Sequence, residues 1–307
     1  MKQLLSVLFA VSAFLLALFF PGIVLTGARS GLSLWAGTLL PTLLPFIILS
    51  NLFIQSGVIY PLMALPGKFS SRYLGLSPSG LYAFVCGFFF GYPSGAKILA
   101  DLLKTGQIEQ EEASWLLVFC NNLSPAFLMT YVLTEHLHHP EWIPETLLIL
   151  YGVPAFLCLL PRCFHHRNMT SQSSSLQNAP KNTSFSMALL DSCILDAIMV
   201  MLRLCGYVML FAILANAASH LPFLPAAWAA CLTALLEITN GVPAVIQAFE
   251  TPYCLVILLP FLAFGGVCSI MQTGSVIKDT PLSWHRYLLG KLLVSIPTLI
   301  LGIIWLY

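Results

Sequence analysis

Long apolar runs separated by short polar segments dominate this sequence. A helix of about 20 residues crosses the hydrocarbon core of a bilayer. The runs that are long enough, or nearly long enough, to span cover residues 4–25, 32–54, 113–133, 146–160, 194–217, 253–277 and 287–306. Only helices and closed barrels satisfy their backbone groups in lipid. The pattern therefore predicts an all-α polytopic membrane protein with about seven crossings.

Two further apolar stretches are interrupted near their middle. Residues 91–95 (Gly-Tyr-Pro-Ser-Gly) interrupt the stretch 81–103, and residues 237–243 (Glu-Ile-Thr-Asn-Gly-Val-Pro) interrupt the stretch 228–249. Each half-stretch is too short to span a bilayer. Each stretch is expected to form either a re-entrant helical hairpin or one broken span.

The same order of features occurs on both sides of a polar segment near the middle of the chain. Each side has a span, an interrupted stretch, a span with a polar or glycine-rich break, and a closing span with an internal proline. With re-entrant hairpins, each half makes three crossings, so the second half is inverted. The expected division is an N-terminal transmembrane helix (1–26), a first repeat (27–162), a polar cytoplasmic linker (163–185) and a second, inverted repeat (186–307).

Composition supports a membrane protein and excludes several classes of function. Apolar residues make up 58% of the chain and charged residues 8%, whereas soluble proteins carry about 25% charged residues. The net charge of +1 comes with scattered basic residues, so no nucleic-acid partner is expected. The nine cysteines lack C-x-x-C spacing and are expected to be buried hydrophobes. No hydrolase, zinc-protease or phosphate-loop motif occurs, so we expect no enzyme, cofactor or metal.

The distribution of charged residues predicts the orientation of the chain. The first run follows Lys2 and resembles a signal peptide, but no clear cleavage site follows, so it is expected to be a retained helix. With a cytoplasmic N-terminus, the outer segments hold Arg29 as their basic residue. The inner segments then hold Lys2, Lys68, Arg72, Lys104, Arg162, Arg167, Lys181, Lys278 and Arg286. The positive-inside rule therefore places the C-terminus outside the cell.

Polar residues at the four interruptions are the candidate binding residues. Broken helices expose unpaired backbone groups, which persist at membrane depth where they face a cavity or a ligand. The candidates are Gly91, Tyr92, Ser94, Gly95, Lys97, Asp101, Asn121, Asn122, Ser124, Glu237, Thr239, Asn240, Ser269 and Gln272.

Each group of candidates has a structural alternative. Lys97 and Asp101 share a helix face, and they either serve a substrate or proton site or form an ion pair that fixes the hairpin. Asn121 and Asn122 either bind a ligand or join helices. Glu237 is either a functional carboxylate or the cap of the following half-helix. The polar residues after position 265 either line a site or cross-link helices.

Three segments carry a resemblance to a known family. Residues 31–46, 86–97 and 121–127 resemble the sporulation integral membrane protein YlbJ family, which carries the nucleoside-recognition, or Gate, domain. That layout is similar to the core of concentrative nucleoside transporters. The resemblance implies two Gate-like repeats, a cell-membrane location in an endospore-forming bacterium, and a role in spore development, with cortex formation as its expected stage.

Three hypotheses about function follow from this sequence. The first is a secondary transporter or permease for an unknown small polar solute, with a proton or sodium as a coupling ion. The second is a non-transporting membrane scaffold for assembly of the spore envelope. The third is a pore made by an oligomer. In each case the lipid bilayer is the expected surrounding.

Overall fold

The computed structural model describes residues 15, 18–58, 75–164, 186–221 and 223–307, and these residues form helices and no strands. Most of the expected N-terminal helix (1–26) and of the linker (163–185) lies outside the described residues. The principal helices are α2 (Pro21–Leu34), α3 (Leu40–Ser56), α5 (Pro78–Phe90), α6 (Ser94–Lys104), α7 (Gln110–Phe119), α8 (Pro125–Phe127), α9 (Ile143–Phe164), α11 (Met187–Ser219), α12 (Ala226–Leu236), α13 (Ile238–Ala248), α14 (Tyr253–Phe264), α15 (Gly266–Ile277) and α16 (Trp284–Leu306).

Among the described residues, five helical segments are long and apolar enough to cross a membrane. They are Pro21–Ser56, Pro140–Leu159, Met187–Ser219, Tyr253–Ile277 and Trp284–Leu306. These segments confirm a helical membrane protein. The segment Tyr253–Ile277 is mostly buried within the bundle, whereas less than half of each of the other four segments is buried.

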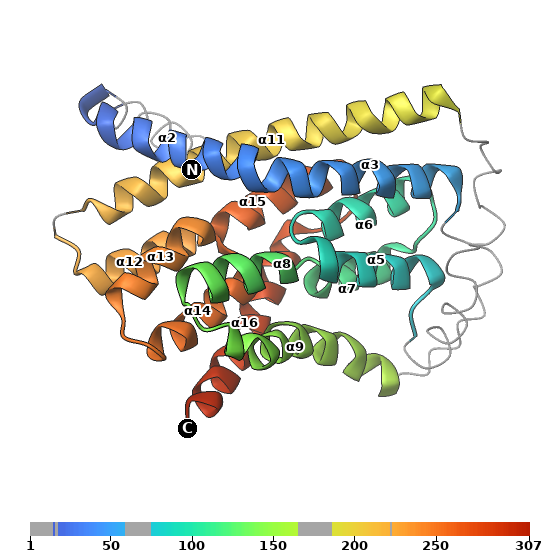
Figure 1. The fold of residues 1–307 in the computed structure, drawn as a ribbon. Helices are drawn as coiled ribbons and strands as arrows, with labels where there is room; N and C mark the ends of the chain where they lie inside the picture. The colour runs from blue at the N-terminus through green and yellow to red at the C-terminus, as the bar shows by residue number, and fades with distance from the viewer. Residues whose placement is uncertain (1–14, 16–17, 59–74, 165–185, 222) are drawn as a thin grey trace, which may run out of the picture.

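The sequence predicts two separate spans, 4–25 and 32–54, with Arg29 in an outer loop between them, but the structure differs there. A π-helical segment, η1 (Trp35–Leu39), joins α2 to α3, and the whole segment Pro21–Ser56 is one continuous helix. It lies along α11 for most of its length (Figure 1). Trp35 Nε1 donates to the Met201 carbonyl at 2.9 Å, and Asn216 Nδ2 donates to the Ile23 carbonyl at 2.7 Å.

Two glycines explain why the expected loop is helical. Gly27 and Gly31 lie four residues apart on the buried face of α2. A Cβ atom at Gly27 would lie 2.7 Å from the Ile213 Cα atom, and one at Gly31 would lie 2.8 Å from the Met209 Cα atom. Small residues at this spacing let two helix backbones approach closely in a membrane. Here the glycines are part of the contact between α2 and α11.

Short helices and helix breaks occupy the rest of the bundle. The pairs α5–α6 and α12–α13 each consist of two short helices that pack against each other across a tight connection. The segment after α7 is interrupted by the non-helical residues 120–124 before α8 and a second π-helical segment, η2 (Leu128–His136). Gly265, with φ +87°, separates α14 from α15. In Figure 1 these breaks lie in the interior of the bundle.

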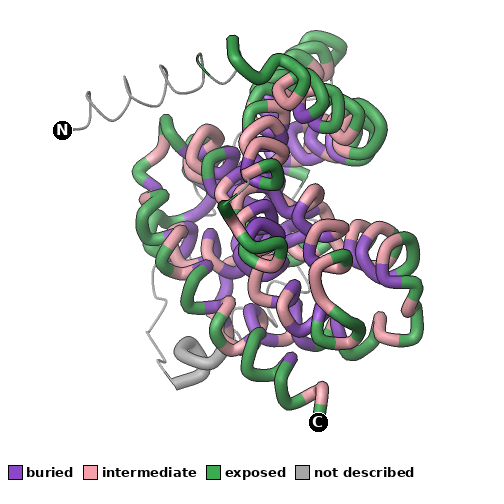
Figure 2. Tube along the Cα trace, turned by 90° about the vertical axis from the view of Figure 1, so that its left-hand side faces the viewer, coloured by how far each residue is buried: buried purple, intermediate pink, exposed green. Residues whose placement is uncertain are grey.

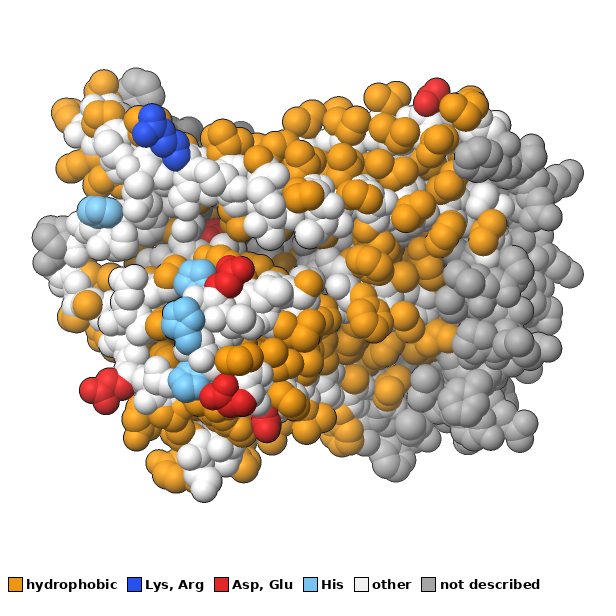
Figure 3. Space-filling model, in the orientation of Figure 1, with side chains coloured by type: hydrophobic (Ala, Val, Ile, Leu, Met, Phe, Trp, Pro, Cys, Tyr) orange, Lys and Arg blue, Asp and Glu red, His pale blue; other side chains and the backbone are white. Residues whose placement is uncertain are grey.

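The surface is suited to lipid. Buried positions concentrate toward the centre of the bundle, and exposed positions lie on its outside (Figure 2). Large exposed apolar side chains include Leu148, Phe156, Leu195, Leu293 and Ile304. Figure 3 shows hydrophobic side chains across the middle of one face, with histidine and most acidic side chains toward its left and an acidic side chain at its upper right. An apolar belt with polar groups toward one end is expected of a protein that crosses a bilayer.

We predict that Gly31→Leu destabilises the contact between α2 and α11. The new side chain overlaps the Met209 backbone, and overpacking of this kind costs about 1–3 kcal/mol. The matched control is Gly22→Leu on the same helix, where an added Cβ atom meets nothing within 4 Å. Thermal unfolding of the detergent-purified protein should show a lower midpoint for Gly31→Leu only. Equal midpoints for the two variants would contradict the close contact.

Candidate functional site

A cavity of about 430 Å³ lies where the four interruptions of the chain meet. Its wall includes residues from both short-helix connections, from the break before α8 and from the break between α14 and α15. The predicted site residues that line it are Gly91, Tyr92, Ser124, Glu237, Thr239, Ser269 and Gln272. The structure thus brings together half of the candidates, drawn from all four interruptions.

Both π-helical segments of the described residues contribute to the same cavity. Thr38 and Leu39 of η1 line one side, and Thr130, Tyr131 and Glu135 of η2 line another. A π-helical turn is rare and occurs frequently at functional sites. Its occurrence on two sides of one cavity marks this cavity as the candidate functional site.

Glu237 is buried and is the residue that connects α12 to α13. Its carboxylate accepts the Thr239 N–H at 3.0 Å and the Asn240 N–H at 2.8 Å, so it caps the N-terminus of α13. The side chain also lines the cavity, and the residue is 4% exposed. The sequence offered two roles for Glu237, a helix cap or a functional carboxylate. The structure shows the cap, and the same side chain also reaches the cavity. A carboxylate at the positive end of a helix is electrostatically favoured.

Two tyrosines tie each short-helix connection to the broken segment of the other half. Tyr92 OH, from the α5–α6 connection, donates to the Leu262 carbonyl of α14 at 3.0 Å. Tyr131 OH, from η2, donates to the Thr239 carbonyl of α13 at 2.9 Å. Pro243 lies four residues after Thr239 and has no N–H, so the Thr239 carbonyl lacks its helical donor. Tyr131 was not among the predicted site residues, although it follows the predicted break.

Asn121 and Asn122 lie behind the cavity wall and join helices. Asn121 Nδ2 donates to Thr273 Oγ1 and to Tyr287 OH, each at 2.8 Å. Asn122 Oδ1 accepts from Lys291 Nζ at 2.9 Å. These side chains are not part of the cavity lining. Their geometry matches the helix-joining alternative rather than direct ligand contact.

Lys291 is a buried lysine that is not among the predicted site residues. It lies in the middle of α16 and is 0% exposed. Its Nζ atom lies 5.8 Å from the centre of the Tyr92 ring and 6.0 Å from that of Tyr287. The signal was available in the sequence, since it is a lone lysine inside the last apolar run. An ammonium is costly to bury, so its hydrogen bond to Asn122 holds α16 against the first break.

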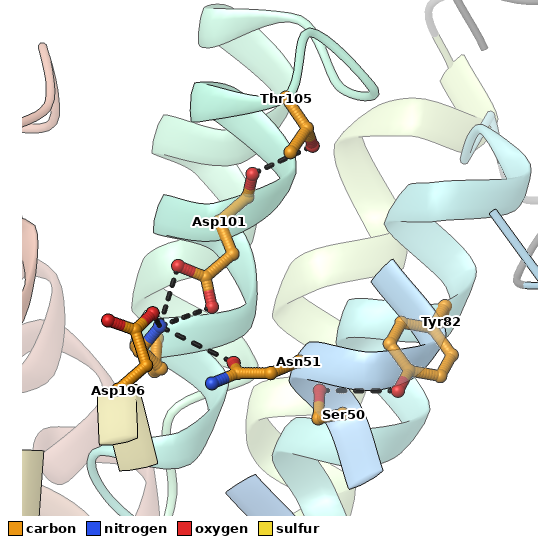
Figure 4. A network of polar contacts seen from close by, with 7 residues as sticks. Ser50, Asn51, Tyr82, Asp101, Thr105 and Asp196 are labelled. Atoms are coloured by element: carbon orange, nitrogen blue, oxygen red, sulfur yellow. Dashed lines mark hydrogen bonds and ion pairs between the residues drawn. The ribbon is translucent and has the colours of Figure 1, made fainter. Parts of the chain in front are cut away.

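Lys97 and Asp101 lie at a second, smaller cavity of about 160 Å³. Lys97 Nζ donates to Asp101 Oδ1 at 2.7 Å and to Asn51 Oδ1 at 3.4 Å, and it lies 3.9 Å from an Asp196 carboxylate oxygen. Figure 4 shows this network, which joins α3, α6 and α11, and the nearby contact between Tyr82 and Ser50. The ion-pair alternative describes this geometry. The pair does not line the larger cavity.

Three other candidates also lie outside the lining of the larger cavity. Ser94 is buried, and its hydroxyl has no partner among the described residues. A Cβ atom at Gly95 would overlap the Cys120 carbonyl, so this glycine permits close packing of α6 against the first break. Asn240 Oδ1 accepts from Ser30 Oγ at 3.0 Å and connects α13 to α2.

We predict that Lys291 and Asn122 are energetically coupled. Lys291→Met leaves the Asn122 oxygen buried without its donor, and Asn122→Leu leaves the ammonium without its acceptor. Removal of one partner costs about 1–3 kcal/mol, whereas removal of both costs less than the sum. Unfolding of the two single variants and the double variant should give a coupling of at least about 1 kcal/mol. Additive losses would show that the hydrogen bond contributes nothing.

Comparisons with known proteins give one partial likeness. The chain is 35% identical over 101 residues to a protein of Bacillus subtilis (strain 168) described as "Sporulation integral membrane protein YlbJ". The matched segment is 33% of this chain and 25% of the relative, so the chain spans about a quarter of the length of the curated relative it matches. No protein-family model matches the chain. No solved structure matches it.

Proposed function

We propose that this protein is a secondary transporter or permease for a small polar solute and that the larger cavity is its substrate site. One observation carries the proposal. All four interruptions of the chain, and both π-helical segments, converge on a single cavity of about 430 Å³. Secondary transporters bind substrates at discontinuous helices near the bilayer midplane. A cavity of this size falls in the range of small-molecule sites.

The proposed architecture is a pair of inverted repeats. In this proposal α5–α6 and α12–α13 are re-entrant hairpins that enter from opposite sides of the membrane, and the segments after α7 and around Gly265 are broken spans. The N-terminus is cytoplasmic and the C-terminus is extracytoplasmic. The chain order and the meeting of both hairpin connections at one cavity support this arrangement. The bias of basic residues supports the orientation.

A thin barrier between the two cavities also supports transport. Gln272 of α15 and Leu204 of α11 line both the larger and the smaller cavity. The rest of the lining of the smaller cavity includes the charged residues Lys97, Asp101 and Asp196. Alternating access needs a central site that can open to either side. In the proposal, movement of α15 relative to α11 would connect the two cavities, with a proton or sodium as the coupling ion.

The relative's name supports a link between the proposed transport and sporulation. Its similarity to one third of this chain supports a sporulation-associated membrane protein. A requirement in formation of the spore cortex is part of this proposal. The alternative functions are a membrane scaffold for assembly of the spore envelope and an oligomeric pore. In the scaffold alternative, changes in the cavity leave sporulation intact and changes in surface loops abolish it.

The topology is tested by alkaline phosphatase fusions, which are active only outside the cytoplasm. Re-entrant hairpins return to the side from which they enter, so fusions after Leu221 and after Glu250 should both be active. Fusions after Gly106 and after Asp279 should both be inactive, and a fusion after Tyr307 should be active. Opposite activities at Leu221 and Glu250 would show that α12–α13 spans the membrane and would contradict the proposal.

The transport proposal is tested in proteoliposomes. The vesicles are supplied with a mixture of nucleosides, amino acids, amines and cell-wall precursors, and uptake is measured by mass spectrometry. We expect saturable uptake of at least one solute. Glu237→Gln and Gln272→Leu should each lower its initial rate at least tenfold, because both side chains line the cavity.

The matched control for this assay is Glu250→Gln, an exposed carboxylate outside the cavity lining. Its uptake should equal that of the unmodified protein. Saturable uptake that is unaffected by both cavity variants would reject the site. Uptake that rises linearly with concentration, together with ion conductance in planar bilayers, would favour the pore. Absence of uptake, with normal sporulation of a Glu237→Gln strain, would favour the scaffold.

A further inference from the structure

The ionisable carboxyl groups that line the proposed substrate site have no basic counterpart in its described lining. Among the described residues that line the larger cavity, the ionisable carboxylates are Glu237 and Glu135, and no Lys, Arg or His side chain lines it. Glu237 lies in the buried part of the wall, and Glu135 is exposed on η2. From this lining we infer that the ligand is a small organic cation, an amine or ammonium group attached to an apolar or aromatic body. This inference rests on the proposed transport site and names its substrate class.

The Glu237 carboxylate is held by neutral hydrogen-bond donors at the start of α13. A carboxylate offers about four lone-pair positions. The donors to Glu237 are the Thr239 and Asn240 N–H groups, one on each oxygen, and the Thr239 and Asn240 side chains also hydrogen-bond to this carboxylate. The α13 N-terminus therefore already has its anion, and an anionic ligand at the same place would meet the charge of Glu237. A cationic ligand would add a charge-assisted hydrogen bond in a water-poor site.

The nearby lysines do not reverse this sign. Lys291 is fully buried, donates to Asn122, and is not part of the cavity lining. Lys97 lies at the smaller cavity, where Asp101 and Asp196 surround it. Both ammonium groups therefore have acceptors of their own, whereas the two carboxylates of the larger cavity have no basic side chain beside them in its described lining.

Aromatic rings supply the rest of the recognition. Phe89, Phe90, Tyr92, Phe127 and Tyr131 all line the cavity. The rings of Phe127 and Tyr131 stack with their centres 4.7 Å apart. Ring faces attract cations and also bury apolar groups, so they suit an ammonium carried on an apolar body. The hydroxyl groups of Thr38, Thr130 and Ser269 offer further polar contacts without adding charge.

The inference is tested by binding of three probes of similar shape to the full-length protein in detergent at pH 7.5. The probes are 2-phenylethylammonium, 2-phenylethanol and 3-phenylpropanoate, measured by isothermal titration calorimetry. The cation should bind at least tenfold more tightly than the alcohol or the carboxylate. Glu237→Gln should weaken binding of the cation at least tenfold and leave the alcohol unchanged. Glu250→Gln should leave all three affinities unchanged.

A second variant covers the case in which Glu237→Gln fails to fold. Glu135→Gln changes an exposed residue and should weaken the cation about two- to fivefold, with a loss that shrinks at high salt. Equal or tighter binding of the carboxylate, absence of binding by all three probes, or cation affinity unaltered in every folded carboxylate variant would each overturn the inference.

These experiments can reject the inferred ligand class and the proposed transport function separately. Uptake of a neutral or anionic solute without binding of the cation rejects the substrate class and leaves transport standing. Binding of the cation with loss in Glu237→Gln, but without uptake of any solute, supports the inferred ligand and rejects transport.

Discussion

This structure depends on one constraint: backbone N–H and carbonyl groups at helix breaks need hydrogen-bond partners inside the membrane. Carbonyl and N–H groups that leave the helical pattern have no water to replace the lost partner. The breaks therefore satisfy one another: Tyr92 OH reaches the Leu262 carbonyl, Tyr131 OH reaches the Thr239 carbonyl, and Tyr151 OH donates to the Leu123 carbonyl at 2.6 Å. Each bond crosses from one interrupted region to another element, so the interruptions must lie together, and a cavity forms between them.

The same constraint explains the close packing around the first break. The Cys120 carbonyl lies against Gly87 of α5 and Gly95 of α6, where any Cβ atom would overlap it. Asn121 and Asn122 then connect the break to α15 and α16 through hydrogen bonds with Thr273, Tyr287 and Lys291. Side chains that looked like ligand contacts are thus used to hold the two halves of the bundle together. The cavity beside them is lined instead by Ser124 and by residues of the other three interruptions.

The sequence could predict where the helices break but not which way each side chain faces. Glycine, proline and polar residues at 91–95, 121–125, 237–243 and 265–266 mark breaks because they disfavour regular helix, and the structure breaks or turns at each. Helices such as α5 and α14 are apolar on nearly every side, so their sequence does not indicate which face is inward. The loop expected near residue 29 is helix, because Gly27 and Gly31 meet α11, a partner far away in sequence.

Glu237 and Lys291 are two deeply buried ionisable residues with different roles, and this difference bears on recognition. They are not an ion pair among the described contacts: Lys291 is held by an amide, and Glu237 by backbone N–H groups. If Glu237 and Lys291 formed an ion pair, each would neutralise the other within the helical bundle. Lys291 instead stabilises the junction with the first break. Glu237 places its carboxyl group at the wall of the cavity, among aromatic rings and with no basic side chain in the described lining. A buried carboxylate in this position favours a ligand of positive charge, since such a ligand recovers part of the desolvation cost of the acid.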